Sequence, residues 1–504
     1  MNRLRPDQTE RARAAWHGFY QTSIASLLEQ HLAEATDARV LEHFRQVARE
    51  VPAYAAFLAQ HGVAPESVRS LPDFGKLPIT TKDNYQRAFP LPELCRGGAL
   101  DACDMLAVSS GSTGAPAFWP RFVADEVGSC MRFEQVLHDT FRCDQRRTLA
   151  VICFALGNWV GGMYTTACCR QLATKGYPLT VATPGNQKLE ILRVLSALRP
   201  HFEQVVLFGY PPFLKDVIDS ARADGFDWHA CPTRLVMAGE VFSEEWRTLV
   251  CERLGSKQPE WSTASLYGTA DGGVLANESA LSITIRRFLS DHPRAARELF
   301  GEARLPTLCQ YDPLHRYFEL DGGELVFSGD GALPLVRYKI LDRGGLVPFD
   351  TMRTFLSDHG FDWTAQWPAA AHERARRMPF VFVFGRANFA LSYYGANVYP
   401  ENVSVGLEQA ALASSVTGKF VMQIVHDSDL NGELDIAVEL APGVAPSVAL
   451  CQDVARSIRQ QLERLNSEFC HYVPAERRSP RVRLLPHGDP SHFPVGVKHR
   501  YTRP

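Results

Sequence analysis

Between residues 104 and 340, strand-like apolar runs alternate with amphipathic stretches, and this alternation indicates one class of fold. The predicted strands are 149–154, 205–208, 234–238 and 262–267, and helical spacing fills 188–198, 212–223 and 243–254. Such alternation is typical of a parallel sheet with helices on both faces. Ligands of these sheets bind beyond the carboxyl ends of the strands, so we expect the functional site in the loops found there.

The regions on either side have other patterns. Residues 1 to about 90 are predicted to be helical, with Asp37 and Thr81 as helix caps. Short alternating runs with Gly turns after residue 320 predict hairpins, and the last part of the chain mixes strands (420–426, 433–440) with a helix at 448–465. We predict an α/β fold with a large N-terminal domain, 1–387, of mostly parallel sheets flanked by helices plus a β-rich subdomain. A small mobile α+β lid, 388–504, follows it.

Composition excludes several classes of partner. A chain of 504 residues with 45% apolar and 22% charged residues is a folded protein, and its net charge of −3 gives no reason to expect nucleic acid or an anionic membrane. The N-terminus lacks a signal-peptide core, and the uncharged run 148–169 is predicted as strand, loop and helix instead of a membrane span. Twelve cysteines without a C-x-x-C pair indicate reduced thiols and a cytoplasmic location.

A loop rich in hydroxyls and glycines, SSGSTGAP at 109–116, follows the apolar residues 105–108. Backbone N–H groups freed by glycine and hydroxyl donors suit phosphate oxygens. The candidate phosphate-binding residues are Ser109, Ser110, Gly111, Ser112, Thr113 and Gly114. No Gly-Lys-Ser/Thr closes the loop, so it is not a Walker-A motif, and in isolation a polar surface turn is the favoured interpretation.

Other motifs follow this loop in a fixed order: FALGNWVGG, FGYPPFLKDVID, AGEVFSEEWR, YGTAD, PLVRYKILDRG, GRANFALSYYGANVYPENV and PVGVKHRY. Together with VPAYAAFLAQHGVAPESVRSLPDFGKLPITTKDNY ahead of the loop, they cover nearly the whole chain. Each motif alone is weakly specific. In this order they resemble the adenylate-forming superfamily of acyl-CoA synthetases, peptide-synthetase adenylation domains and luciferases, and more closely its phenylacetate–CoA ligase branch.

This resemblance implies an AMP-forming acid–thiol ligase. A carboxylic acid would react with the α-phosphate of ATP to give an acyl adenylate, and coenzyme A would then displace AMP to give a thioester. Such phosphoryl chemistry depends on positioning and charge stabilisation, for which Mg²⁺ is expected. The expected partners are a small carboxylic acid and coenzyme A, or a carrier protein, with no nucleic acid and no membrane. The sequence leaves the oligomeric state open, although relatives are often homodimers.

The resemblance also implies roles for single residues. Lys498 would lower the repulsion between the carboxylate and the α-phosphate, with Thr113 and Asp271 as further catalytic residues and Asp271 as the metal ligand. The 109–114 loop would hold the phosphates. The remaining ATP-binding residues would be Glu240, Tyr267, Gly268, Thr269, Asp342 and Arg386. The acid pocket would be formed by Phe154, Gly157, Asn158, Trp159, Tyr210 and Gly239, and Asn388 would be the hinge.

Each of these residues also has an ordinary structural interpretation. Glu240 could be a solvated acid before a helix capped by Ser243, and Tyr267 a core aromatic. Asp342 is compatible with a Gly-rich turn, and Lys498 with a solvated basic tail. The aromatic pocket residues suit a flat aryl or arylalkyl acid, or belong to the core.

The chain departs from the family pattern at several positions. Ala115 stands where many relatives have lysine, Asp271 where they have glutamate, and Tyr394 where they have arginine. Asn388 replaces the usual hinge Asp or Lys, and Lys498 follows Gly-Val instead of a glycine directly. We interpret the chain as a divergent, active member. Two alternatives remain open: transfer of the acyl group to a carrier protein or a nitrogen nucleophile in specialised metabolism, and a nucleotide-binding homologue that has lost catalysis.

Overall fold

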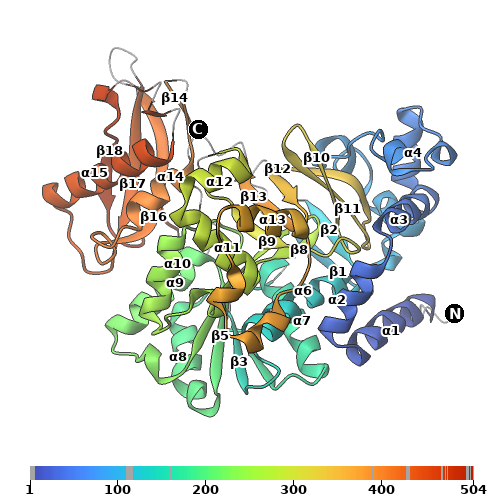
Figure 1. Cartoon of the computed structure of the whole chain (residues 1–504), viewed down its shortest axis with the longest axis horizontal. Coiled ribbons are helices and arrows are strands. Elements are labelled where there is room, and N and C mark those ends of the chain that lie inside the picture. The colour runs from blue at the N-terminus through green and yellow to red at the C-terminus, as the bar shows by residue number, and fades with distance from the viewer. Residues whose placement is uncertain are drawn as a thin grey trace.

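The computed structural model describes residues 6–108, 117–157, 160–302, 304–386, 391–394, 396–426, 432–466, 469–470, 473, 475–494, 499 and 501–502. The elements up to β13 form a large body, and those from β14 onward form a smaller lobe, coloured orange to red in Figure 1. The predicted boundary between residues 387 and 388 lies outside the described residues and stays a prediction.

One continuous 11-stranded sheet runs through the large body in the order β10-β11-β12-β13-β9-β8-β7-β6-β5-β3-β4. Its parallel half comprises β4 (Leu179–Ala182), β3 (Thr148–Ile152), β5 (Gln204–Gly209), β6 (Thr233–Ala238) and β7 (Thr263–Thr269). Four of these five strands lie within two residues of the predicted ranges. The α/β fold expected from the alternation is therefore confirmed.

The antiparallel half continues the same sheet. It comprises β8 (Gly273–Asn277), β9 (Thr307–Gln310), β13 (Phe380–Arg386), β12 (Leu335–Val347), β11 (Glu324–Gly329) and β10 (Tyr317–Asp321). The sequence predicts hairpins in this region, as a β-rich subdomain of the large domain. In the structure they belong to the same sheet as the parallel strands, because β13, β9 and β8 connect β12 to β7.

Both faces of the parallel half are buried, as the near-continuous apolar strands predict. Along β3, Leu149 and Val151 face one apolar cluster, whereas Ala150 and Ile152 face another. The first face is covered by α8 (Lys188–Leu198), α9 (Pro211–Ala223) and α10 (Glu244–Arg253). The second face is covered by α1 (Pro6–Gln21), α2 (Ile24–Ala33), α6 (Val127–Gln135) and α7 (Val160–Thr174).

The remaining helices of the large body are α3 (Thr36–Glu50), α4 (Pro52–Gln60), α5 (Leu71–Phe74), α11 (Ala280–Asp291), α12 (Pro293–Phe300) and α13 (Phe349–Asp358). Pro52 begins α4, which explains the predicted interruption. The prediction for Asp37 is wrong: the N-cap is Ala35, and Asp37 lies in the first turn of α3, where its charge favours the helix dipole. Thr81 does cap the π-helical turn Lys82–Gln86, in a capping box with Asn84.

The lobe has its own sheet, β16 (Val416–His426), β17 (Gly432–Leu440) and β18 (Arg481–Leu485), and a hairpin of β14 (Leu391–Tyr393) and β15 (Ala396–Val398). Helices α14 (Pro400–Leu407) and α15 (Val448–Leu465) pack with these strands around one apolar cluster. The bounds of α15 are those predicted from its periodicity, and Ser447 caps it. This mixture of helices and strands agrees with the expected α+β character.

The uncharged run 148–169 contains β3 and the first part of α7, as predicted. In the described part of the chain, no helix combines the length and apolar character that crossing a bilayer requires.

Candidate functional site

The carboxyl ends of three parallel strands bring the described acid-pocket candidates to one edge of the sheet. Phe154 follows β3 and Tyr210 follows β5, and their rings lie 5.0 Å apart in an edge-to-face contact. Gly239 follows β6 with a φ of +84°, and a Cβ atom there would lie 2.8 Å from the Tyr210 ring. Glycine is therefore required by both its backbone angle and its neighbour. Gly157, the next candidate after β3, also has a positive φ.

Glu240 connects this edge to the lobe. The hydroxyl of Tyr501 donates a hydrogen bond to Glu240 Oε2 at 2.5 Å. Tyr501 itself is held to the lobe, because its carbonyl oxygen accepts a hydrogen bond from the Met422 N–H of β16 at 2.8 Å. Burial, and after it the Glu240 carboxylate, raises the pKa of Tyr501 well above its ordinary value, so the phenol keeps its proton and donates.

Tyr501 is a site residue that the sequence analysis missed. It lies 261 positions from Glu240, and no periodicity or spacing links the two side chains. The only signal was its place three residues after Lys498 in PVGVKHRY.

A second contact joins β7 to β12. The Tyr267 hydroxyl donates to Asp342 Oδ2 at 2.8 Å, and the Asp342 side chain is buried. Asp342 is the backbone partner of Arg386 in the β12–β13 ladder. Gly268, next to Tyr267, is pressed against β8, since a Cβ there would meet the Gly273 carbonyl oxygen at 2.8 Å. The nucleotide-binding candidates on strands β7, β12 and β13 thus share one region of the sheet.

Asp271 lies in the tight turn between β7 and β8. Its Oδ2 accepts a hydrogen bond from the Tyr338 hydroxyl at 2.7 Å, and Gly272 N–H donates to Thr269 Oγ1 at 2.9 Å. The Arg121 guanidinium, at the end of β2 (Phe118–Arg121), donates to the Asp271 carbonyl oxygen at 3.2 Å. The turn that carries this carboxylate is therefore anchored from two sides.

Several predicted residues lie outside the described part of the chain. The 109–114 loop falls between β1 (Met105–Val108) and β2, whose ends pair through Val108 and Phe118. Asn158, Trp159, Asn388 and Lys498 also lie outside the described residues, and of Arg386 only the backbone is described. Their assignments stay predictions.

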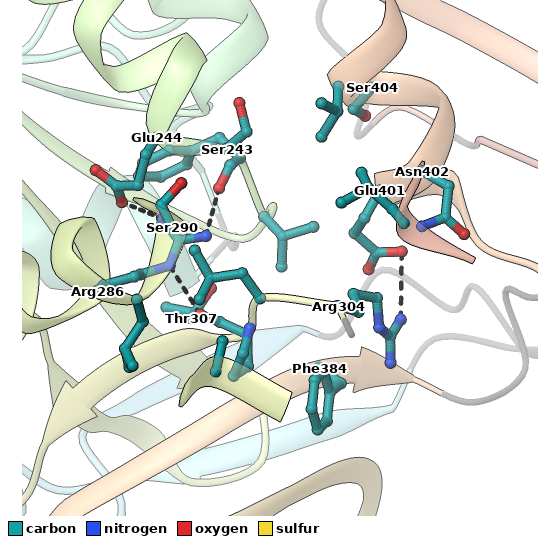
Figure 2. Close-up of a pocket in the computed structure, with 18 of the residues that line it drawn as sticks. Ser243, Glu244, Arg286, Ser290, Arg304, Thr307, Phe384, Glu401, Asn402 and Ser404 are labelled. Atoms are coloured by element: carbon teal, nitrogen blue, oxygen red, sulfur yellow. Dashed lines mark hydrogen bonds and ion pairs between the residues drawn. The ribbon is translucent and has the colours of Figure 1, made fainter. Parts of the chain in front are cut away.

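A cavity of about 90 Å³ lies where the large body meets the lobe (Figure 2). Its walls include Ser243, Glu244 and Arg286 from the large body and Glu401 and Ser404 from α14. Arg286 is held in place, with its guanidinium paired to the Glu244 carboxylate. Val241, the residue after Glu240, lines the cavity. The lining residues include no nucleotide-binding candidate whose side chain is described. The cavity therefore lies next to the candidate site and is not part of it.

Further side-chain contacts cross the same interface. Arg304 lies 3.5 Å from Glu401 Oε2, as Figure 2 shows, and its guanidinium stacks between the rings of Phe384 and Tyr399. The Ser243 hydroxyl donates to Glu408 at the end of α14.

Burial raises the pKa of Glu408 to about 7, against a lowering by the Ser243 hydrogen bond, and the charge of Glu245 raises it further. The lobe is therefore docked partly through a carboxyl group that favours its protonated form.

Comparison with known proteins gives one sequence relative and several structures of similar fold. No protein-family model matches the chain. The chain is 23% identical over 414 residues to a phenylacetate–coenzyme A ligase from Aromatoleum evansii, and the match covers 79% of each protein. Two solved structures of a 2-hydroxyisobutyryl-CoA ligase, each 14% identical, have similar folds.

The first of these ligase structures, in the postadenylation state with 2-HIB-AMP, matches with a TM-score of 0.64 over 92% of this chain and 88% of that chain. The second, an open conformation with 2-HIB-AMP and CoA, matches with a TM-score of 0.52 over 92% and 90%. The chain therefore has the fold of the adenylate-forming CoA ligases, and the resemblance to their phenylacetate–CoA ligase branch, predicted from its motifs, is confirmed.

Proposed function

We propose that this protein is an AMP-forming acid–thiol ligase, which activates a carboxylic acid with ATP and transfers the acyl group to coenzyme A. The observation that carries the proposal is the arrangement of Glu240, Tyr267, Asp271 and Asp342 beside the carboxyl ends of the parallel strands. The sequence similarity to a phenylacetate–coenzyme A ligase supports it.

The described residues have the chemistry that a nucleotide requires. Asp342 would accept hydrogen bonds from the ribose hydroxyls, and its hydrogen bond with Tyr267 fixes the direction of the carboxylate. The Tyr267 ring would stack on the adenine, and Arg386 would reach the ribose or the phosphates. Glu240 would fix the base, so the hydrogen bond from Tyr501 would couple nucleotide binding to the position of the lobe.

Asp271 would hold Mg²⁺. A carboxylate is the ligand that this ion prefers, and the Tyr338 hydrogen bond orients Oδ2, so the residues fit the ion. When bound, Mg²⁺ would offset the negative charge of the phosphates. The 109–114 loop, with Thr113, would bind the β- and γ-phosphates through its hydroxyl and N–H groups.

Lys498 would act in the adenylation step, in which the substrate carboxylate approaches the α-phosphate of ATP. Its ammonium would lie between the substrate carboxylate and the α-phosphate and stabilise the charge that develops there. We assign Lys498 to a mobile lobe that begins at 388, with Asn388 as the hinge. Rotation of this lobe would then open the path for the thiol.

The acid would lie against Phe154, Tyr210 and Gly239, with Gly157, Asn158 and Trp159 completing the pocket. The edge-to-face pair of Phe154 and Tyr210 offers apolar ring surface, which favours an aryl or arylalkyl acid over a short aliphatic one. We further propose a cytoplasmic location and a homodimeric assembly.

The test is product analysis with a panel of acids, ATP and Mg²⁺, with and without coenzyme A. We expect AMP, pyrophosphate and an acyl-CoA thioester identified by its mass, with aryl acids the best substrates. AMP formation that needs an amine or a carrier protein in place of coenzyme A would favour the first alternative. No acid-dependent AMP with any acceptor would favour a homologue that has lost catalysis.

A further inference from the structure

Three side chains with metal-ligand chemistry meet outside the candidate site. His31 lies in the last turn of α2, and Asp312 and His315 lie in the turn after β9. Nδ1 of His31 is 2.7 Å from Asp312 Oδ2, and Nδ1 of His315 is 3.8 Å from the same oxygen. All three ligand atoms lie within 4.8 Å of one another.

These distances are close to those of a bound transition metal. Zinc bonds of about 2.0–2.1 Å to nitrogen and oxygen place tetrahedral ligand atoms roughly 3.3 Å apart. The observed separations of 2.7 and 3.8 Å lie on either side of that value. Changes of about half an ångström in the two nitrogen–oxygen separations would bring both to that value.

His315 has a nitrogen that the protein leaves unsatisfied. Its Nδ1 is buried and has no hydrogen-bond partner among the described residues. The ring lies over Gly128 of α6, where a Cβ atom would come within 2.8 Å of Nδ1. Since a buried polar atom without a partner is destabilising, such an atom 3.8 Å from a carboxylate oxygen points to a missing ligand.

The Asp312 carboxylate is oriented as metal-binding carboxylates are. Its Oδ1 accepts the Leu314 N–H at 3.0 Å, and Arg132 lies 3.7 Å from Oδ2. Such outer contacts fix the direction of a ligand. The Arg132 charge also opposes a cation, so we expect weaker binding than three ligands alone would give.

The side chains differ in accessibility: 1% of Asp312 is exposed, against 21% of His31 and 27% of His315. Solvent can therefore reach the cluster past the two imidazoles.

We propose that His31 Nδ1, His315 Nδ1 and Asp312 Oδ2 bind a divalent transition-metal ion of the zinc class, with water in the fourth position. Two imidazoles and one carboxylate favour zinc over Mg²⁺ or Ca²⁺, which take oxygen ligands. Binding requires both Nδ1 lone pairs, so His31 gives up its Nδ1–H···O bond and carries its proton on Nε2. The ion would cross-link α2 to the turn after β9, across 281 residues of chain.

The test uses the purified full-length chain, stripped with a chelator and titrated with Zn²⁺, and then with Co²⁺ as a spectroscopic probe. We expect one bound ion per chain and tetrahedral Co²⁺ bands without the thiolate charge-transfer absorption that cysteine ligands produce. Zinc at a hundred times its Kd should raise the melting temperature by about 3 °C. None of these measurements depends on ligase activity, so the proposal stands or falls separately from the proposed function.

Zinc binding by substituted variants tests whether the ion lies at this cluster. His31→Ala and His315→Ala should each weaken zinc binding by more than tenfold and abolish the melting-temperature shift. His17→Ala, which removes an exposed histidine of α1, should leave both unchanged. His31→Gln keeps the size of the side chain and replaces His31→Ala if that variant unfolds. Zinc binding by both histidine variants at the wild-type affinity would overturn the proposal, as would a wild-type chain that retains no zinc.

Discussion

Two kinds of tyrosine–carboxylate contact surround the candidate site, and they differ in what they join. Tyr267–Asp342 and Tyr338–Asp271 each connect strands or turns of one continuous sheet. Tyr501–Glu240 connects the tail of the lobe to that sheet. A contact within one sheet persists when the lobe moves, whereas a contact between the two bodies must break. Under the proposed function, the first kind would keep the nucleotide in place and the second would act in one lobe position.

The interface around the lobe supports this distinction. Its described contacts include polar pairs, Arg304–Glu401 and Ser243–Glu408 among them, and a cavity remains between the bodies. Interfaces of this kind permit relative motion, unlike the buried apolar clusters that cover both faces of the parallel strands. We therefore expect substitutions in the sheet to impair both half-reactions and substitutions in the lobe to impair mainly one.

The largest expected effect is that of Lys498→Ala. Adenylation, measured as acid-dependent ATP–pyrophosphate exchange, should fall on the order of a thousandfold, because a charge that stabilises the transition state is lost. Thioester formation from a supplied acyl adenylate should be retained. Lys257→Ala, at an exposed lysine of the large body, is the control. Equal losses in both half-reactions would show that Lys498 does not act in one lobe position.

Asp342→Ala should have the next largest effect and a different pattern. Loss of charged hydrogen bonds to the ribose costs about 3 kcal/mol, or roughly a hundredfold, in each half-reaction, because both involve the same nucleotide group. The same two assays measure it, with Asp224→Ala, at an exposed aspartate after α9, as the control. A variant impaired in only one half-reaction would refute the division between sheet and lobe.

Tyr501→Phe should have a smaller effect. It removes one hydrogen bond to a carboxylate, so adenylation should slow about tenfold while thioester formation changes less. Tyr394→Phe, at an exposed tyrosine of the lobe, controls for loss of a hydroxyl. Wild-type rates in Tyr501→Phe would mean that the contact with Glu240 has no part in adenylation.

Glu408→Gln should have the smallest effect on turnover of these variants. Its main effect should be on the pH dependence of lobe docking. The pKa of Glu408 is raised from 4.5 to about 7 in the docked state, so docking favours the protonated carboxyl. Docking should be strongest below the undocked pKa and weaken, by at most about 3 kcal/mol, as pH rises through 7. Limited proteolysis at the 387–390 segment between about pH 5 and 8 measures this. Glu408→Gln should flatten the profile, and an unchanged profile would assign the dependence to another group.

Local features of the fold were predictable from the sequence, and long-range pairings were not. Helix α15 begins and ends where its apolar spacing predicts, and the burial of both faces of β3 follows from its apolar residues 149–152. The union of both halves into one sheet depends on pairings such as β13 with β9, which no local pattern encodes. For the same reason, the sequence alone did not predict the Tyr501–Glu240 contact or the cluster of His31, Asp312 and His315. These contacts join segments 261 and 281 positions apart, so only the fold brings them together.

The most direct test of the central claim is ATP–pyrophosphate exchange by the wild-type protein with an aryl acid and no thiol present. If the sheet holds the nucleotide while the acid is activated, exchange will depend on the acid and proceed without coenzyme A, and later addition of coenzyme A will release AMP. Exchange that requires coenzyme A, or formation of ADP in place of AMP, would contradict the account.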